Sequence, residues 1–156
     1  MSEFRQVVEI RVSPARVWSV LLDVEHWPEW NTSVLKVKRM DIGPLTLGSR
    51  TRIWQPRLMP AVWQVTSLDE QRRIFAWTTH ALGVKINACH QVETVKSQSR
   101  VTLSLRYTGV LGPMLARILR DLNRDYIARE GEGLRRQCEL PAARSSQPRM
   151  QSSQIS

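Results

Sequence analysis

The chain has 156 residues, of which 42% are hydrophobic and 24% are charged, a composition typical of one soluble globular domain. It carries 23 Lys and Arg against 14 Asp and Glu, which gives a formal net charge of +9. No apolar run is long enough for a membrane-spanning helix, and residues 1–10 lack the apolar stretch of a secretory signal. We therefore expect a cytoplasmic protein.

The segment 141–156 differs in composition from the rest of the chain. It is rich in Ser, Gln, Pro and Ala and holds one large aliphatic residue in isolation. Such a segment cannot bury enough apolar surface to offset the entropy of ordering it. We predict a folded domain over residues 1–140 and a disordered tail over residues 141–156.

The N-terminal part of the domain predicts one strand and two short helices. Residues 4–12 alternate in a period of two, which is typical of a strand with one buried face. Ser13 and Pro14 then form a helix start, because the Ser oxygen can accept a hydrogen bond from an orphan amide. A second short helix is expected after Asp23, with an interruption at residues 27–30.

Six further strands are expected in the middle of the chain, separated by turns containing Gly, Pro, Asp or Ser. Because each connection is short, neighbouring strands should pair antiparallel. The predicted strands span residues 33–41, 49–55, 61–68, 73–80, 84–95 and 100–108.

A single long helix is expected from Pro113 to Cys138, with an apolar stripe at spacings of three and four and arginines on the opposite side. The stripe consists of Leu115, Ile118, Leu119, Leu122, Tyr126, Ile127, Leu134 and Cys138. The sequence thus predicts an α+β fold in which a curved seven-stranded antiparallel sheet wraps around a long C-terminal helix, with two short helices between strands 1 and 2. A cavity between sheet and helix is the expected by-product, with room for a drug-sized or lipid-sized ligand.

Short motifs along nearly the whole chain before the tail form a recognisable set. They are Ser13-Pro14-Ala15-Arg16-Val17-Trp18, Asp23-Val24-Glu25-His26-Trp27-Pro28-Glu29-Trp30, Gly48-Ser49-Arg50, Trp63-Gln64-Val65, Phe75-Ala76-Trp77, Gly83, His90, Gly109-Val110-Leu111-Gly112-Pro113 and Glu130-Gly131-Glu132-Gly133-Leu134. This set resembles the START-like helix-grip superfamily (SRPBCC), also described as polyketide cyclase/dehydrase and lipid transport. The resemblance implies a cavity for a hydrophobic ligand without naming that ligand, since members range from cyclases and dehydratases to carriers with no catalysis.

His90 and Glu130 are the two titratable residues expected near the cavity. His90 lies on the same face of its predicted strand as the apolar residues, so its side chain should point toward the cavity. There it could hold a ligand or move a proton. Alternatively, it could form a hydrogen bond with a protein group and so connect the sheet to the helix. Glu130 lies at the edge of the helical stripe, where it is either a cavity acid or, as we prefer, a partner of an arginine near the helix end.

The other predicted ligand contacts come from the apolar parity of the strands and from the helical stripe. The full predicted site consists of Trp30, Ile53, Gln55, Trp63, Phe75, Trp77, Thr79, His90, Leu105, Tyr107, Leu115, Leu119, Leu122 and Tyr126.

We expect no metal and no cofactor. The three histidines have no ligand-like spacing with each other or with Cys89 or Cys138, and neither cysteine has an activating base nearby in sequence. The sequence contains no GxGxxG, GxxxxGK[ST] or GxSxG motif, which argues against phosphate cradling and a nucleophile elbow.

Three functions remain open. The preferred one is a carrier or sensor that binds a small hydrophobic, lipid-like or polyketide-like molecule. The second is a cyclase or dehydratase acting through His90 in the same cavity. The third is binding of nucleic acid or an anionic membrane through the basic surface, and we rank it last because no basic run exceeds two residues. Transient contact of a carrier with acidic lipid or an acidic partner is compatible with the first.

Overall fold

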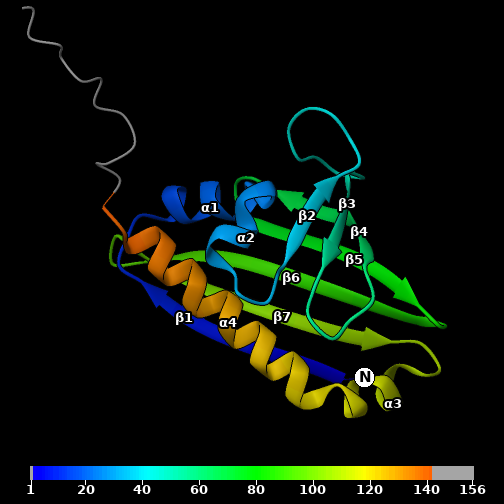
Figure 1. Cartoon of the computed structure of the whole chain (residues 1–156). Helices are drawn as coiled ribbons and strands as arrows, with labels where there is room; N and C mark the ends of the chain where they lie inside the picture. The colour runs from blue at the N-terminus through cyan, green and yellow to red at the C-terminus, as the bar shows by residue number, and fades with distance from the viewer. Residues whose placement is uncertain (1, 142–156) are drawn as a thin grey trace, which may run out of the picture.

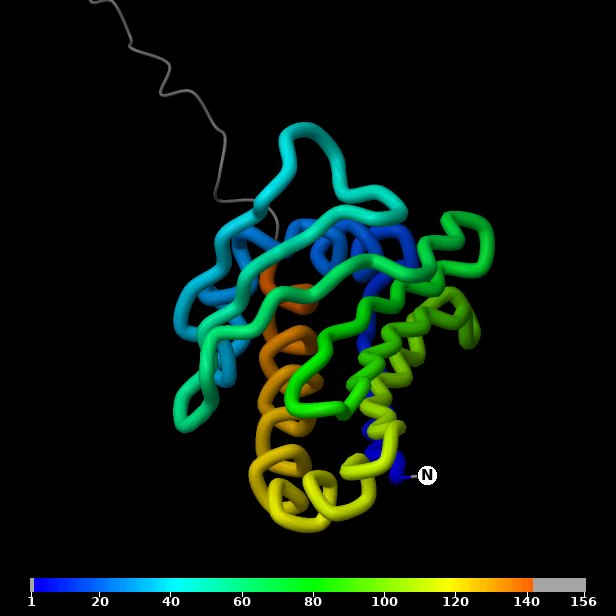
Figure 2. The backbone as a smooth tube through the Cα atoms, turned by 90° about the vertical axis from the view of Figure 1, so that its right-hand side faces the viewer, coloured from blue at the N-terminus to red at the C-terminus, as the bar shows by residue number. Residues whose placement is uncertain are grey.

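In the computed structural model, which describes residues 2–141, the seven strands form one antiparallel sheet in the order β1-β7-β6-β5-β4-β3-β2. The sheet curves around the long C-terminal helix (Figures 1 and 2). No helix among the described residues is both long and apolar enough to cross a membrane. The predicted disordered tail lies outside the described residues except for Pro141.

The elements follow the predicted order closely. The strands are β1 (Ser2–Ile10), β2 (Lys36–Arg39), β3 (Arg50–Trp54), β4 (Ala61–Asp69), β5 (Ile74–Ala81), β6 (Val84–Val95) and β7 (Gln98–Thr108). The helices are α1 (Pro14–Leu22), the short 3-10 helix η1 (Val24–His26), α2 (Trp27–Trp30), α3 (Gly112–Ile118) and α4 (Arg120–Glu139). This confirms the predicted α+β class, the seven-stranded antiparallel sheet and the two short helices, α1 and α2, after the first strand.

The ends of two predicted strands differ from the structure. β1 begins and ends two residues before the predicted range 4–12, because the Ser13 hydroxyl already caps α1 by accepting a hydrogen bond from the Arg16 amide at 3.4 Å. The strand predicted over 33–41 is limited to β2. Its first residues are occupied by a turn in which Asn31 accepts hydrogen bonds from the amide and hydroxyl of Ser33.

The prediction of one unbroken helix from Pro113 to Cys138 was wrong, because the chain turns at Leu119 and separates α3 from α4. The two helices pack on different surfaces. Ala116 of α3 is buried against Val84 and Tyr107 at one end of the sheet, whereas α4 runs along β1 and against α1. The apolar spacing continues through the turn, but Ile118, which we placed on the buried stripe, is exposed.

α4 approaches its neighbours closely at two glycines. An ideal Cβ on Gly133 would lie 2.0 Å from the backbone oxygen of Trp30 in α2. A Cβ on Gly131 would lie 2.6 Å from a methyl group of Val8 in β1. A glycine normally weakens a helix, so its use at these two positions is explained by the space that the sheet and α2 occupy.

We predict that Gly133→Ala lowers the free energy of unfolding by about 2 kcal/mol, because the added methyl group meets backbone that must shift. Without that contact the same change would stabilise the helix by about 1 kcal/mol. Urea denaturation measures the difference. Gln137→Ala, on the same helix, is the control, and it should change stability by less than about 0.5 kcal/mol. A Gly133→Ala protein as stable as the wild type would contradict the close packing.

Candidate ligand-binding site

His90 connects the sheet to α4. Its side chain is 4% exposed, and it stacks on the Phe75 ring with 5.0 Å between ring centroids. Nδ1 lies 3.2 Å from the backbone oxygen of Phe75, and Nε2 lies 2.8 Å from Oε1 of Glu130 on α4. Both ring nitrogens are therefore engaged by protein groups, which matches the structural interpretation of His90 given by the sequence.

The two contacts of His90 lie on opposite sides of its ring. The Phe75 carbonyl can only accept, so Nδ1 donates to it. Nε2 faces Oε1 of Glu130, so the pair links β6 to α4 across the interior. The expectation that Glu130 reaches an arginine was wrong, because β6 places His90 nearer to it.

The predicted aromatic residues pack on one another around His90. Trp77 contacts Trp63, Phe75 and Trp27, with ring centroids 5.9, 4.9 and 5.2 Å apart. Trp27 also lies 5.5 Å from the His90 ring. These side chains form a buried layer that joins α2 to the middle of the sheet.

Three predicted polar residues hold the helices and loops in place. Tyr107 donates to Oδ1 of Asn123 on α4 at 3.1 Å and accepts from its Nδ2 at 2.8 Å. Burial raises the pKa of the Tyr107 phenol, with a smaller opposite effect from Asn123. Tyr126 donates to the backbone oxygen of Pro56, and Gln55 donates to the backbone oxygen of Ser33 at 3.2 Å.

The remaining predicted contacts fall into two groups. Trp30, Ile53 and Thr79 are buried, and Trp30 packs on Trp27. The half-buried members are Leu105, Leu115, Leu119 and Leu122. The structure thus places most of the predicted residues on the sheet, on α2 and on the C-terminal helices, with Gln55 directly after β3 and Leu119 between α3 and α4. Their role as ligand contacts stays a prediction.

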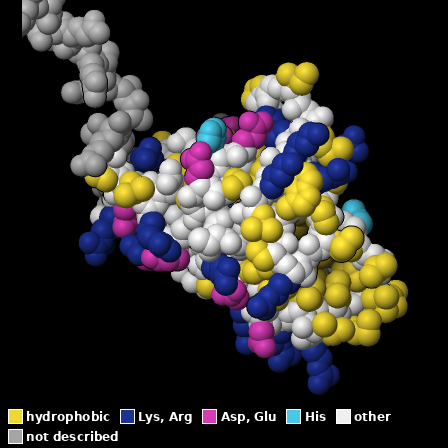
Figure 3. Space-filling view, viewed as in Figure 1, with side chains coloured by type: hydrophobic (Ala, Val, Ile, Leu, Met, Phe, Trp, Pro, Cys, Tyr) yellow, Lys and Arg dark blue, Asp and Glu magenta, His cyan; other side chains and the backbone are white. Residues whose placement is uncertain are grey.

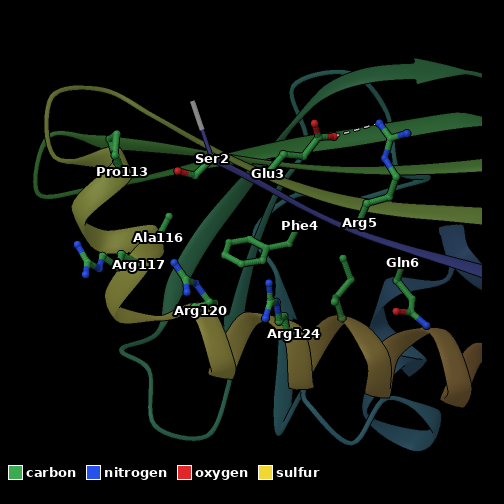
Figure 4. Close-up of a pocket in the computed structure, with 11 residues that line it drawn as sticks. Ser2, Glu3, Phe4, Arg5, Gln6, Pro113, Ala116, Arg117, Arg120 and Arg124 are labelled. Atoms are coloured by element: carbon green, nitrogen blue, oxygen red, sulfur yellow. Dashed lines mark hydrogen bonds and ion pairs between the residues drawn. The ribbon is translucent and has the colours of Figure 1, made fainter.

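A pocket of about 690 Å³ lies between the N-terminal half of β1 and the junction of α3 and α4 (Figure 4). Apolar groups of Phe4, Ala116 and Ile127 form part of its wall, with Gln6 beside them. Its complete lining is Ser2, Glu3, Phe4, Arg5, Gln6, Pro113, Ala116, Arg117, Arg120, Arg124 and Ile127. None of the predicted ligand contacts belongs to this lining.

The pocket is strongly basic along its helical side. Arg117, Arg120 and Arg124 lie on the side that faces Phe4 in Figure 4, and none of them forms an ion pair with any residue among those described. Glu3, the acid in the lining, is already 3.2 Å from Arg5. The arginines are therefore available to a ligand that carries hydrogen-bond acceptors or negative charge.

The sequence places these arginines on the side of the helix opposite the apolar stripe. Their spacing of three and four residues does show that they share one side of the helix. The sequence does not show that the edge strand β1 faces that side, so the pocket could not be found from the pattern alone.

Neither cysteine has the environment of a reactive thiol. Burial raises the pKa of the Cys138 thiol to about 11 and also raises the pKa of the Cys89 thiol, which disfavours the nucleophilic thiolate. No group of three or more His, Cys, Asp or Glu residues that could hold a metal ion lies within residues 2–141.

The family model described as polyketide cyclase / dehydrase and lipid transport matches residues 1–139. The chain belongs to this family. The match covers every element of the sheet and all the helices, and it confirms the resemblance that the sequence motifs indicate.

Solved structures with the same fold share little sequence with this chain. A hypothetical protein of Helicobacter pylori, jhp0584, is 16% identical with a TM-score of 0.75, and the match covers 88% of each chain. Truncated norcoclaurine synthase from Thalictrum flavum is 16% identical with a TM-score of 0.71, covering 90% of this chain and 94% of that one. The di-domain ARO/CYC protein BexL of the BE-7585A biosynthetic pathway is 18% identical with a TM-score of 0.68, covering 86% of this chain and 46% of BexL.

At these identities the likeness establishes the helix-grip fold and leaves the chemistry open. Comparison with curated protein sequences gave no match.

We predict that Glu130→Ala lowers the free energy of unfolding by about 1–3 kcal/mol, because it leaves the buried Nε2 of His90 without a partner. Glu130→Gln should restore most of the loss, since its amide can still form a hydrogen bond with Nε2 of His90. Asp125→Ala, which removes an exposed acid from the same helix, should cost less than about 1 kcal/mol. Chemical denaturation of the three variants measures this, and equal losses for Glu130→Ala and Asp125→Ala would contradict it.

Proposed function

We propose that the protein binds a small hydrophobic ligand between its sheet and its C-terminal helices, as a carrier or sensor. The observation that carries the proposal is the pocket of about 690 Å³ between β1 and the α3–α4 junction. This volume lies in the range typical of small-molecule sites. The family description, which includes lipid transport, agrees with such a ligand.

The pocket lining supports a ligand with two chemically different parts. Phe4 and Ile127 offer apolar surface to a hydrocarbon or ring body. Arg117, Arg120 and Arg124 offer donors to an oxygen-rich or anionic end, and guanidinium groups bind carboxylate and phosphate in paired geometry. A fatty acid or an acidic polyketide-like molecule has both parts.

The predicted interior contacts remain part of the proposal. Phe4 separates the pocket from them, because its ring meets that of Tyr107 edge-to-face, with 6.0 Å between centroids. Leu115 packs in the same small cluster. A ligand whose apolar part displaced the Phe4 ring would reach these residues and then Leu105, which lies opposite Phe4 on β7.

The geometry around His90 favours binding over catalysis. A general base must reach the proton that it abstracts, and both nitrogens of His90 are bonded to Phe75 and Glu130 behind a layer of aromatic rings. A cyclase or dehydratase function would therefore need this pair to open toward a substrate.

We predict that Gln6→Trp weakens binding of Nile red, an uncharged apolar probe, by about tenfold or more, because the indole fills the pocket. The matched control is Val7→Trp, which adds the same group to the opposite, half-exposed face of the same strand. Fluorescence titration of the two variants measures the effect. If Gln6→Trp binds the probe as well as Val7→Trp does, the pocket is not the binding site.

The Glu130→Gln variant distinguishes a carrier function from an enzymatic function. It keeps a hydrogen bond to His90 but removes the carboxyl group, so a His90–Glu130 catalytic pair would lose turnover by about 100-fold or more. We expect probe affinity to change by less than about threefold, as for any group outside the pocket. A polyketide-like substrate that is converted by the wild type but not by this variant would establish the enzyme instead.

A further inference from the structure

Apolar side chains are exposed together at one end of the molecule. Val110 is 95% exposed, Leu82 85% and Ile118 68%, and Leu111 and Met114 beside them are also exposed. We call these five residues the α3 patch. Figure 3 shows hydrophobic side chains gathered at this end, over α3 and the neighbouring turns. Contiguous exposed apolar surface of this kind marks an interaction site.

The α3 patch is built from turns that touch one another. An ideal Cβ on Gly109 would lie 2.5 Å from the backbone oxygen of Gly83, so the β5–β6 turn and the β7–α3 turn are in contact. Leu82 and Val110 are their exposed side chains, and α3 follows directly at Gly112. Side chains on such turn tips can enter an apolar phase while the sheet behind them stays folded.

Positive charge borders the α3 patch. Arg117 and Arg120 flank Ile118, Arg124 follows one turn later on α4, and Lys85 follows Leu82 across its turn. None of these four forms an ion pair within the described part of the chain. Asp121 is an exposed acid among them, so the local balance is clearly positive.

We propose that the α3 patch docks on the surface of a bilayer that contains anionic lipids. The apolar side chains enter the interface between headgroups and acyl chains, and the arginines pair with lipid phosphates. A bilayer satisfies both features at once. Nucleic acid would pair with the arginines but leave Val110, Met114 and Ile118 exposed to water.

Docking extends the proposed function without depending on it. Arg117, Arg120 and Arg124 line the pocket as well as border the α3 patch, so the pocket opens at the docked surface. A ligand drawn from the bilayer would then reach the pocket without crossing bulk water, which is the step that an apolar molecule makes slowly.

The first test measures sedimentation of the full chain with vesicles of phosphatidylcholine, with and without phosphatidylserine. We expect binding that requires phosphatidylserine and weakens as salt is raised, because exposed charges are screened. Equal binding to both vesicles, no binding to either, or tighter binding to duplex DNA than to the anionic vesicles would overturn the proposal.

The second test removes charge. Arg117→Gln with Arg120→Gln should lower the partition coefficient on anionic vesicles about 30-fold, from about 1 kcal/mol for each basic group at such a surface. The control is Arg72→Gln with Lys96→Gln, in the β4–β5 and β6–β7 turns at the other end of the strands. It removes the same charge and should reduce binding less than about threefold. Equal losses would show that net charge alone is responsible.

The third test removes apolar surface. Val110→Ser with Ile118→Ser should weaken vesicle binding by about tenfold or more. The control is Ile42→Ser with Leu47→Ser, in the exposed β2–β3 loop that lies opposite α3 in Figures 1 and 2. It should change binding by less than about twofold. Since all four side chains are exposed, circular dichroism should show the same fold in both proteins.

Ligand binding in the pocket and docking through the α3 patch can be tested independently of each other. Gln6→Trp, which fills the pocket, should bind anionic vesicles as the wild type does, and Val110→Ser with Ile118→Ser should bind Nile red unchanged. Loss of vesicle binding in Gln6→Trp would overturn docking through the α3 patch, whereas loss of the probe alone concerns only the pocket.

Discussion

The close packing of α4 against the sheet and α2 is the constraint on which the rest of the structure depends. Gly131 and Gly133 remove the side chains that would otherwise separate this helix from Val8 and Trp30. At that distance Glu130 reaches His90 across the interior. The same placement turns the arginine side of the helix toward the N-terminal half of β1, where the pocket lies.

A consequence of this packing is that the polar groups between sheet and helices satisfy one another. His90 is bonded on both nitrogens, and Tyr107 and Asn123 exchange two hydrogen bonds. Buried polar groups that are fully paired rigidify a core, and they leave no free acid or base facing the interior at these positions. A pocket lies instead at the sheet edge, between β1 and the junction of α3 and α4.

Much of the fold was predictable because burial imposes simple periods on the sequence. The alternation in β1 and in β3 to β7, the Ser13 cap and the long C-terminal helical pattern all express this one rule. The break at Leu119 was not predictable, since the three-and-four spacing runs through it and only the position of the sheet end decides where α3 stops.

The site was less predictable than the fold, because its residues meet across the structure rather than along the chain. Parity placed His90 on the inner face correctly, yet its partner Glu130 lies 40 residues away on another element. The stripe of Arg117, Arg120 and Arg124 is visible in the sequence as a spacing of three and four residues. What makes them part of a pocket is the edge strand opposite them, and no local pattern encodes that pairing.

Native mass spectrometry of the purified protein, with extraction and identification of any small molecule that it carries, tests the central claim most directly. Our account predicts a bound apolar molecule with an acidic or oxygen-rich end in the wild type and in Val7→Trp, and its absence from Gln6→Trp. A bare protein mass from every preparation, even after incubation with mixed fatty acids and lipids, would contradict it, as would an adduct that Gln6→Trp retains.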